Sequence, residues 1–185
     1  MKRILLLLLL SLPIFLLAQQ KAEEQFTSKQ ITIDIGFTGI QVGAELIAGE
    51  NSTFQFRSGL IPFLYNPTGY YEDMKWMLGL SFSGEYRFYY NFARRLEKGK
   101  DIYNNGANYV GILALYLSRP LGKDKELEKT TSAIVIGPMW GFNRPISERL
   151  LLHLSLGPAL QNEIDNHRST GTLYGDLRVC FLLNK

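Results

Sequence analysis

The stretch 74–92, MKWMLGLSFSGEYRFYYNF, alternates between two kinds of side chain along its whole length. Its even-numbered positions are apolar or aromatic except for Gly84, whereas the odd-numbered positions include Lys75, Glu85 and Arg87. Such alternation separates the two sets onto opposite faces of a β-strand, while a helix would spread each set around its circumference. Ordinary strands have about five or six residues, and a tilted strand that crosses a bilayer needs about 9–11. The stretch therefore predicts a membrane-crossing strand.

Aromatic side chains mark the two ends of this apolar face. Trp76 lies near one end, and aromatic residues crowd positions 86–92 at the other. Aromatic residues at both interfaces, with aliphatic residues between them, are typical of the girdles of membrane barrels. The predicted girdle comprises Trp76, Tyr86, Phe88, Tyr90, Phe92 and Trp140.

Seven further segments bring the predicted strand count to eight. They are 30–37, 40–49, 53–64, 108–118, 133–142, 150–161 and 173–183, of which 108–118 is apolar on both faces. Short turns at 49–52 and 145–149 and longer polar loops at 66–69, 122–130 and 163–171 separate the strands. An even strand count, with short turns at one end and long loops at the other, predicts an all-β, eight-stranded, antiparallel up-and-down transmembrane barrel. The turn at 37–39 is unusually short for the loop end, and the connection at 93–107 is unusually long for the turn end.

The N-terminus predicts export. Lys2 and Arg3 precede an apolar run at 4–17, which ends at Ala18. This order is typical of a signal peptide, and the run is shorter than the roughly 20 residues of a membrane-spanning helix. We therefore expect a cleaved signal peptide at 1–18, a periplasmic tail at 19–29 and an outer-membrane barrel at 30–185. A retained membrane anchor is the alternative.

The polar faces of the strands predict a filled barrel interior. An eight-stranded barrel has a lumen just wide enough for side chains, and the Gly and Ser residues on these faces suit such crowding. Because buried charges need partners, we expect an ion-pair network that plugs the lumen. Its predicted members are Asp34, Glu45, Arg57, Glu85, Arg87, Asp176 and Arg178. In the alternative, a secreted soluble lipocalin-like barrel, the apolar faces would line a ligand cavity and the polar faces would meet water.

The amino-acid composition limits which partners and cofactors are expected. The chain has 185 residues, 20 of them basic and 17 acidic, and no basic stripe that would favour nucleic acid. Its single cysteine, Cys180, excludes an internal disulfide framework and a cysteine zinc site, and no cofactor or metal is expected. Outer-membrane lipid is the expected partner. The basic segment, defined as Arg94, Arg95, Lys98 and Lys100, could contact lipid head groups or the cell wall, or form a solvated turn.

A nucleophile triad is the main catalytic alternative. His153 and Ser155 share one strand face, and Glu163 or Glu85 could complete a triad. Barrel enzymes that remove acyl chains from lipid A use His, Ser and Glu on their strands. However, His153 and Ser155 are predicted to face the lumen, away from lipid. A lumen-packing histidine and a non-enzymatic protein are therefore expected.

Three prolines interrupt predicted strands, because proline cannot donate a hydrogen bond to a ladder. They are Pro62, Pro138 and Pro158. Gly137-Pro138 and Gly157-Pro158 lie at similar distances from the turn at 147–148. We expect these two pairs to lie near each other across a hairpin, as bulges or local kinks.

Two motifs resemble a group of small outer-membrane β-barrel proteins of unassigned function. One is EYRFYYNF at 85–92, followed by the basic segment and Asn108-Tyr109. The other is GPMWGF at 137–142, followed by an Arg-bearing turn and a Leu-rich strand that ends in Gly157. The resemblance covers about 38–185. It implies an eight-stranded outer-membrane barrel and no catalytic residues.

Overall fold

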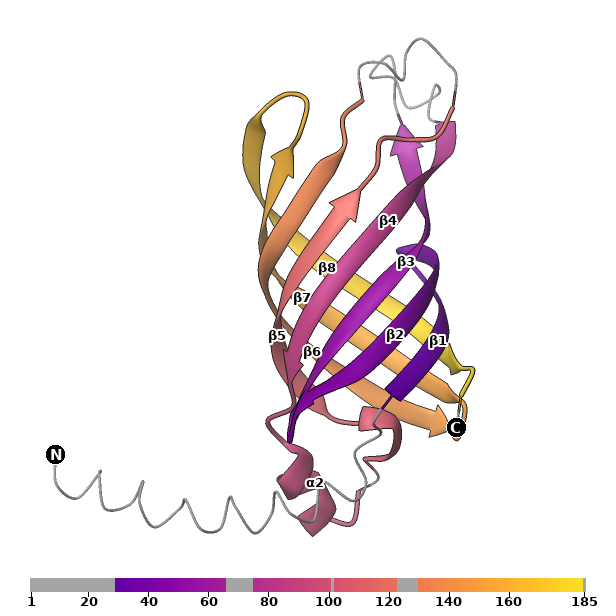
Figure 1. Cartoon of the computed structure of the whole chain (residues 1–185), viewed down its shortest axis with the longest axis vertical. Helices are drawn as coiled ribbons and strands as arrows, with labels where there is room; N and C mark the ends of the chain where they lie inside the picture. Colours follow the sequence, from indigo (N-terminus) through magenta and orange to yellow (C-terminus); the bar gives the residue numbers. More distant parts are fainter. Residues whose placement is uncertain (1–28, 66–74, 101, 123–129, 185) are drawn as a thin grey trace, which may run out of the picture.

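Eight antiparallel strands close into a barrel in the computed structural model, which describes residues 29–65, 75–100, 102–122 and 130–184. Each strand pairs with its neighbours in sequence, and β1 closes the ring on β8 (Figure 1). The predicted fold of eight antiparallel strands is confirmed. The strands are β1 (Lys29–Gly36), β2 (Gly39–Gly49), β3 (Ser52–Tyr65), β4 (Lys75–Phe88), β5 (Asn108–Leu117), β6 (Ala133–Ser147), β7 (Leu150–Glu163) and β8 (Arg168–Leu182).

The predicted leader and most of the predicted tail, residues 1–28, lie outside the described residues. Lys29, predicted to end the tail, instead opens β1. We call the end of the barrel where β1 begins and β8 ends the base, and the opposite end the mouth (Figure 1). At the base, β4 and β5 are joined by a connection that holds α2 (Phe92–Glu97) and the 3-10 turn η2 (Tyr103–Asn105). No described helix is long and apolar enough to cross a bilayer.

Buried and exposed side chains alternate along the strands, and the side chains predicted to face inward are the buried ones. On β4, Ser81 and Ser83 are buried, whereas Phe82 between them is 50% exposed. Trp76, near the mouth end of the same strand, is 75% exposed. The apolar faces thus point out of the barrel and the polar faces point into the lumen, where polar side chains find partners.

Strand β4 ends at Phe88, four residues earlier than predicted, and this corrects the girdle. Phe92 begins α2 and is 2% exposed, so it does not belong to an outer girdle. Its ring stacks on that of Tyr89 at 4.9 Å, because the chain leaves the sheet and turns across the base. The other five predicted girdle residues are exposed, namely Trp76, Tyr86, Phe88, Tyr90 and Trp140.

The β6–β7 and β7–β8 hairpins extend further than predicted. Strand β6 continues to Ser147, so the turn before β7 shrinks to Glu148 and Arg149. Strand β8 begins at Arg168, inside the predicted loop, and its first residues pair with β7 from Glu163 onward. Polar residues at the mouth were expected to form a loop, but they continue the ladder beyond the apolar band.

Pro138 and Pro158 lie opposite each other across β6 and β7 without a bulge. The same register holds on both sides of them, with Ile136 paired to Leu160 and Trp140 paired to Leu156. No residue is inserted between these pairs, so the expected bulge is wrong, but the ladder is interrupted at 137–139 and 157–159, which is consistent with the other expectation, a local kink. The adjacent glycines are required here, because a Cβ on Gly137 or Gly157 would lie 2.2 or 2.1 Å from the facing proline oxygen.

The β1–β2 turn depends on Gly39, which gives a first testable prediction. Its φ is +92°, and a Cβ there would lie 2.0 Å from the Leu60 carbonyl oxygen. We expect Gly39→Ala to lower the free energy of unfolding by more than about 1 kcal/mol, measured by urea titration. Gly99→Ala is the control, because its φ is +62° but nothing lies within 4 Å of the added Cβ. Equal losses in both variants would show that the contact with Leu60 is unimportant.

Candidate functional site

The seven residues predicted to plug the lumen meet inside the barrel, and we call them the lumen network. They come from five strands, β1, β2, β3, β4 and β8, because each lies on the inward face of its strand. Every one of them is at most 5% exposed. The members are Asp34, Glu45, Arg57, Glu85, Arg87, Asp176 and Arg178.

Each arginine of the lumen network bridges two carboxylates. Arg57 pairs with Glu85 and, at 3.0 Å, with Asp176. Arg87 pairs with Glu85 at 2.6 Å and with Glu45 at 3.6 Å. Arg178 pairs with Asp176 and, at 3.4 Å, with Asp34. The seven groups therefore form one chain of alternating charge across the lumen, in the order Glu45, Arg87, Glu85, Arg57, Asp176, Arg178, Asp34.

Neutral donors complete the network at Glu45. Four carboxylates against three guanidinium groups leave one excess negative charge. The Oε1 atom of Glu45 accepts hydrogen bonds from Thr53 Oγ1 at 2.7 Å, Tyr89 OH at 2.6 Å and Asn105 Nδ2 at 3.2 Å. Burial, and next the charge of Glu45, raise the pKa of Tyr89 well above its usual range. The phenol therefore keeps its proton and donates a hydrogen bond to the carboxylate.

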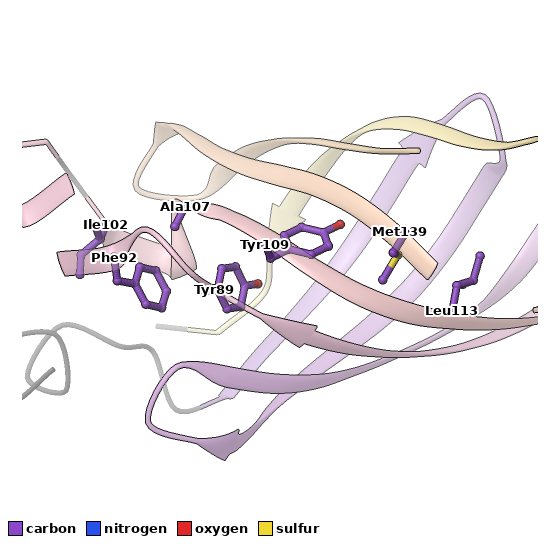
Figure 2. Close-up of a cluster of buried hydrophobic side chains, with 7 residues drawn as sticks. All are labelled: Tyr89, Phe92, Ile102, Ala107, Tyr109, Leu113 and Met139. Atoms are coloured by element: carbon purple, nitrogen blue, oxygen red, sulfur yellow. The ribbon is translucent and has the colours of Figure 1, made fainter. Parts of the chain in front are cut away.

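An apolar cluster lies at the base and extends to the level of the network, and we call it the base cluster. It runs from the β4–β5 connection into the lumen (Figure 2) and consists of Tyr89, Phe92, Ile102, Ala107, Tyr109, Leu113 and Met139. The Arg87 guanidinium lies 4.7 Å from the centre of the Tyr109 ring. Asn104 Nδ2 donates to the Glu148 carbonyl at 3.0 Å, which ties the connection to the β6–β7 turn. The described part of this connection therefore packs against the base, with Ile102 and Ala107 buried in the base cluster.

The base cluster was missed from the sequence, although two signals pointed to it. Tyr89 and Tyr109 both lie on the inward face of the chain, where polar residues dominate. Large aromatic rings on that face indicate a packed interior. The sequence does not show that Phe92 and Ile102 fold back to join them, because those contacts depend on the path of the connection.

His153 is buried in the lumen, as expected, and its partners differ from the predicted triad. Its Nδ1 lies 2.8 Å from Asn143 Oδ1, and its Nε2 lies 3.2 Å from Tyr109 OH and 3.3 Å from Ser155 Oγ. Asn143 thus occupies the place expected for Glu163 or Glu85. His153 and Ser155 are each 1% exposed. A substrate cannot reach a serine in this position, so the geometry favours a packing role.

The basic segment lies at the base, on α2 and the residues that follow it (Figure 1). Arg94, Lys98 and Lys100 are exposed, whereas Arg95 is half-buried. The structure therefore presents three of the four predicted basic side chains at the surface of this end.

The described residues also include a thiol, Cys180, which is buried and forms no disulfide. In the described part of the chain, no group of three or more His, Cys, Asp and Glu side chains is placed to hold a metal ion. Comparison with family models, curated proteins and solved structures finds no match for the chain. The function is therefore inferred from the barrel itself.

Proposed function

We propose that this protein is an integral β-barrel of the outer membrane with a closed lumen, which serves a structural or interaction role and not catalysis. One observation is the main support for the proposal: the apolar faces of the strands point outward, whereas the charged side chains are buried inside the barrel. Soluble monomers rarely expose apolar patches larger than a few hundred Å². Hydrocarbon around the barrel would remove these side chains from water at a gain of roughly 25 cal/mol per Å².

The facing of the side chains disfavours the soluble alternative. A lipocalin-like barrel would enclose its apolar face and hold an apolar ligand there. Here Trp76 and Phe82 are outside, and Glu85 and Arg87 are inside. Strand closure also suits a bilayer, because hydrocarbon offers no partner to unpaired backbone groups.

The lumen supports a non-conducting role. The lumen network crosses the barrel, and the base cluster packs beside it and toward the base. Ions would have to break several buried ion pairs to pass. We therefore expect no step-like currents when the refolded protein is added to planar bilayers, and regular ohmic steps would contradict a closed lumen.

The base is assigned to the periplasmic side. The predicted leader and the short turns at 49–52 and 148–149 support this side for the termini. Arg94, Lys98 and Lys100 would then face phosphate head groups of the inner leaflet or the cell wall. The resemblance to small outer-membrane barrels of unassigned function is consistent with this placement.

Fractionation of cells that express the whole chain tests membrane insertion. We expect the protein in the outer-membrane fraction, released only by detergent, with a different gel mobility before and after boiling. Boiling changes the mobility because a folded barrel resists the gel detergent. A protein that stays in the periplasmic extract without detergent would contradict the proposal.

A further inference from the structure

The wall of the barrel has a gap near the mouth, above the β1–β2 turn. Backbone pairing of β1 with β8 ends at Gly36 and Arg178, followed by one hydrogen bond from Phe37 N to the Leu177 oxygen, and β2 pairs with β3 only as far as Ile40 and Leu60. Beyond these pairs, residues 61–65 of β3 and 168–175 of β8 continue toward the mouth. Among the described residues, no strand pairs with their facing edges. The short β1–β2 hairpin is visible well below the other strand ends (Figure 1).

A cavity of about 260 Å³ passes through this wall gap, and we call it the mouth cavity. Its lining includes outward-facing residues at the gap, Pro62, Leu173 and Gly175, together with inward-facing residues, Val135 and Ser83. In a continuous sheet, residues on opposite faces cannot line the same cavity. The mouth cavity therefore connects the lumen to the outer face of the barrel.

Apolar side chains surround both sides of the wall gap. Phe37, at the β1–β2 turn, is 80% exposed, and Leu173 on β8 is 85% exposed. On the inner side, Leu115, Leu117 and Val135 line the cavity. Polar residues, among them Thr38, Gln161 and Thr172, also line the cavity, so its wall is only partly apolar. If the barrel lies in a membrane, as proposed above, this opening faces hydrocarbon.

The floor of the mouth cavity is polar and has unused hydrogen-bonding capacity. The Oγ atom of Ser83 and the Nε atom of Arg57 are buried without a hydrogen-bond partner among the described residues. Leaving such groups unpaired is costly, so they indicate a ligand atom that accepts hydrogen bonds. The lumen network already carries one excess negative charge, which disfavours an anionic head group.

We propose that the mouth cavity binds one single-chain lipid with an uncharged oxygen head group, such as a fatty alcohol or a monoacylglycerol. The head-group oxygen of the lipid accepts hydrogen bonds from Ser83 and Arg57. The hydrocarbon chain runs between the apolar residues of the cavity and leaves through the wall gap. At about 260 Å³ the cavity lies just below the usual range for ligand sites, about 300–1,000 Å³, so it accommodates only part of one chain. This inference rests on the proposed membrane insertion.

Native mass spectrometry with 1-hexadecanol tests the proposal. The full chain is purified in a sterol-based detergent, which has no alkyl chain to compete for the cavity. We expect one bound hexadecanol per barrel, and weaker binding of palmitate at pH 8. Tighter binding of palmitate would overturn the uncharged head group. A second polypeptide bound in equal amount and excluding hexadecanol would show that a protein strand occupies the gap.

Two glycine positions on β8 provide a matched pair of variants. A Cβ on Gly175 or Gly171 meets nothing within 4 Å, but only Gly175 lines the mouth cavity. We expect Gly175→Phe to weaken hexadecanol binding at least tenfold, because the ring blocks the wall gap, while Gly171→Phe binds like the unchanged protein. Equal effects of the two variants would overturn lateral binding through the gap.

Ser83→Ala tests the floor of the cavity. We expect roughly five- to tenfold weaker hexadecanol binding, because one hydrogen bond to the head group is lost. Ser155→Ala is the control, since Ser155 is also buried in the lumen but does not line the mouth cavity. Unchanged binding in Ser83→Ala would overturn the assigned head-group site.

A membrane-inserted, heat-modifiable barrel without bound hexadecanol would overturn this inference alone, whereas a water-soluble protein would overturn the proposed function.

Discussion

Replacing Phe82 by arginine is expected to destabilise the barrel in a bilayer by about 2–4 kcal/mol and to prevent most of it from inserting. Phe82 lies midway along β4 and is 50% exposed on the outer face. A guanidinium group at this depth would have to leave water for hydrocarbon. Folding into phospholipid vesicles, followed by the shift in gel mobility, measures the effect.

Phe82→Leu is the matched control for this substitution. It removes the ring but keeps an apolar group on the lipid face, so we expect folding close to that of the unchanged protein. In a soluble barrel, an exposed arginine at position 82 would be harmless. Normal insertion of Phe82→Arg would therefore contradict the assignment of the outer face to hydrocarbon.

Replacing Arg57 of the lumen network by methionine is also expected to lower the free energy of unfolding strongly. Arg57→Met takes a cation away from Glu85 and Asp176 and raises the excess charge of the network from one negative to two. Breaking a buried ion pair from one side costs about 3–5 kcal/mol, because a charge stays buried without compensation. We expect this loss in the free energy of unfolding, measured by urea titration in detergent.

A charge-balanced double variant separates the charge effect from the loss of packing. Arg57→Met combined with Glu85→Gln returns the network to one excess negative charge, and Arg87 still pairs with Glu45. We expect the double variant to regain most of the lost stability. If the double variant is less stable than Arg57→Met, the contribution of Arg57 is not electrostatic.

The existence of the strands and the facing of their side chains were predictable from the sequence, because alternation with a period of two separates side chains onto the two faces of a strand. Ser81, Ser83 and Glu85 alternate with apolar residues, and all three are buried. The membership of the lumen network followed from the same rule. The pairing of Arg57 with Asp176, 119 residues later in the chain, did not, because periodicity contains no information about which strands face each other across the lumen.

The structure of the base and the wall gap could not be predicted from the sequence, for a different reason. Aromatic residues continue past Phe88, so the pattern does not show where β4 ends or that Phe92 turns inward. The unusually short turn at 37–39 was visible, but its consequence depends on how far β3 and β8 extend beyond it. Strand β8 begins in a polar segment that resembled a loop.

Accessibility of single cysteines along β4 tests the central claim most directly. Each of Leu80→Cys, Ser81→Cys, Phe82→Cys and Ser83→Cys is made in a Cys180→Ala background, labelled with a nitroxide and reconstituted in vesicles. Collisions with oxygen, which dissolves in hydrocarbon, and with a water-soluble nickel complex then report the surroundings of each position. We predict high oxygen and low nickel accessibility at 80 and 82, and lower oxygen accessibility at 81 and 83. High nickel accessibility at 80 and 82 would place the apolar face in water and contradict the account.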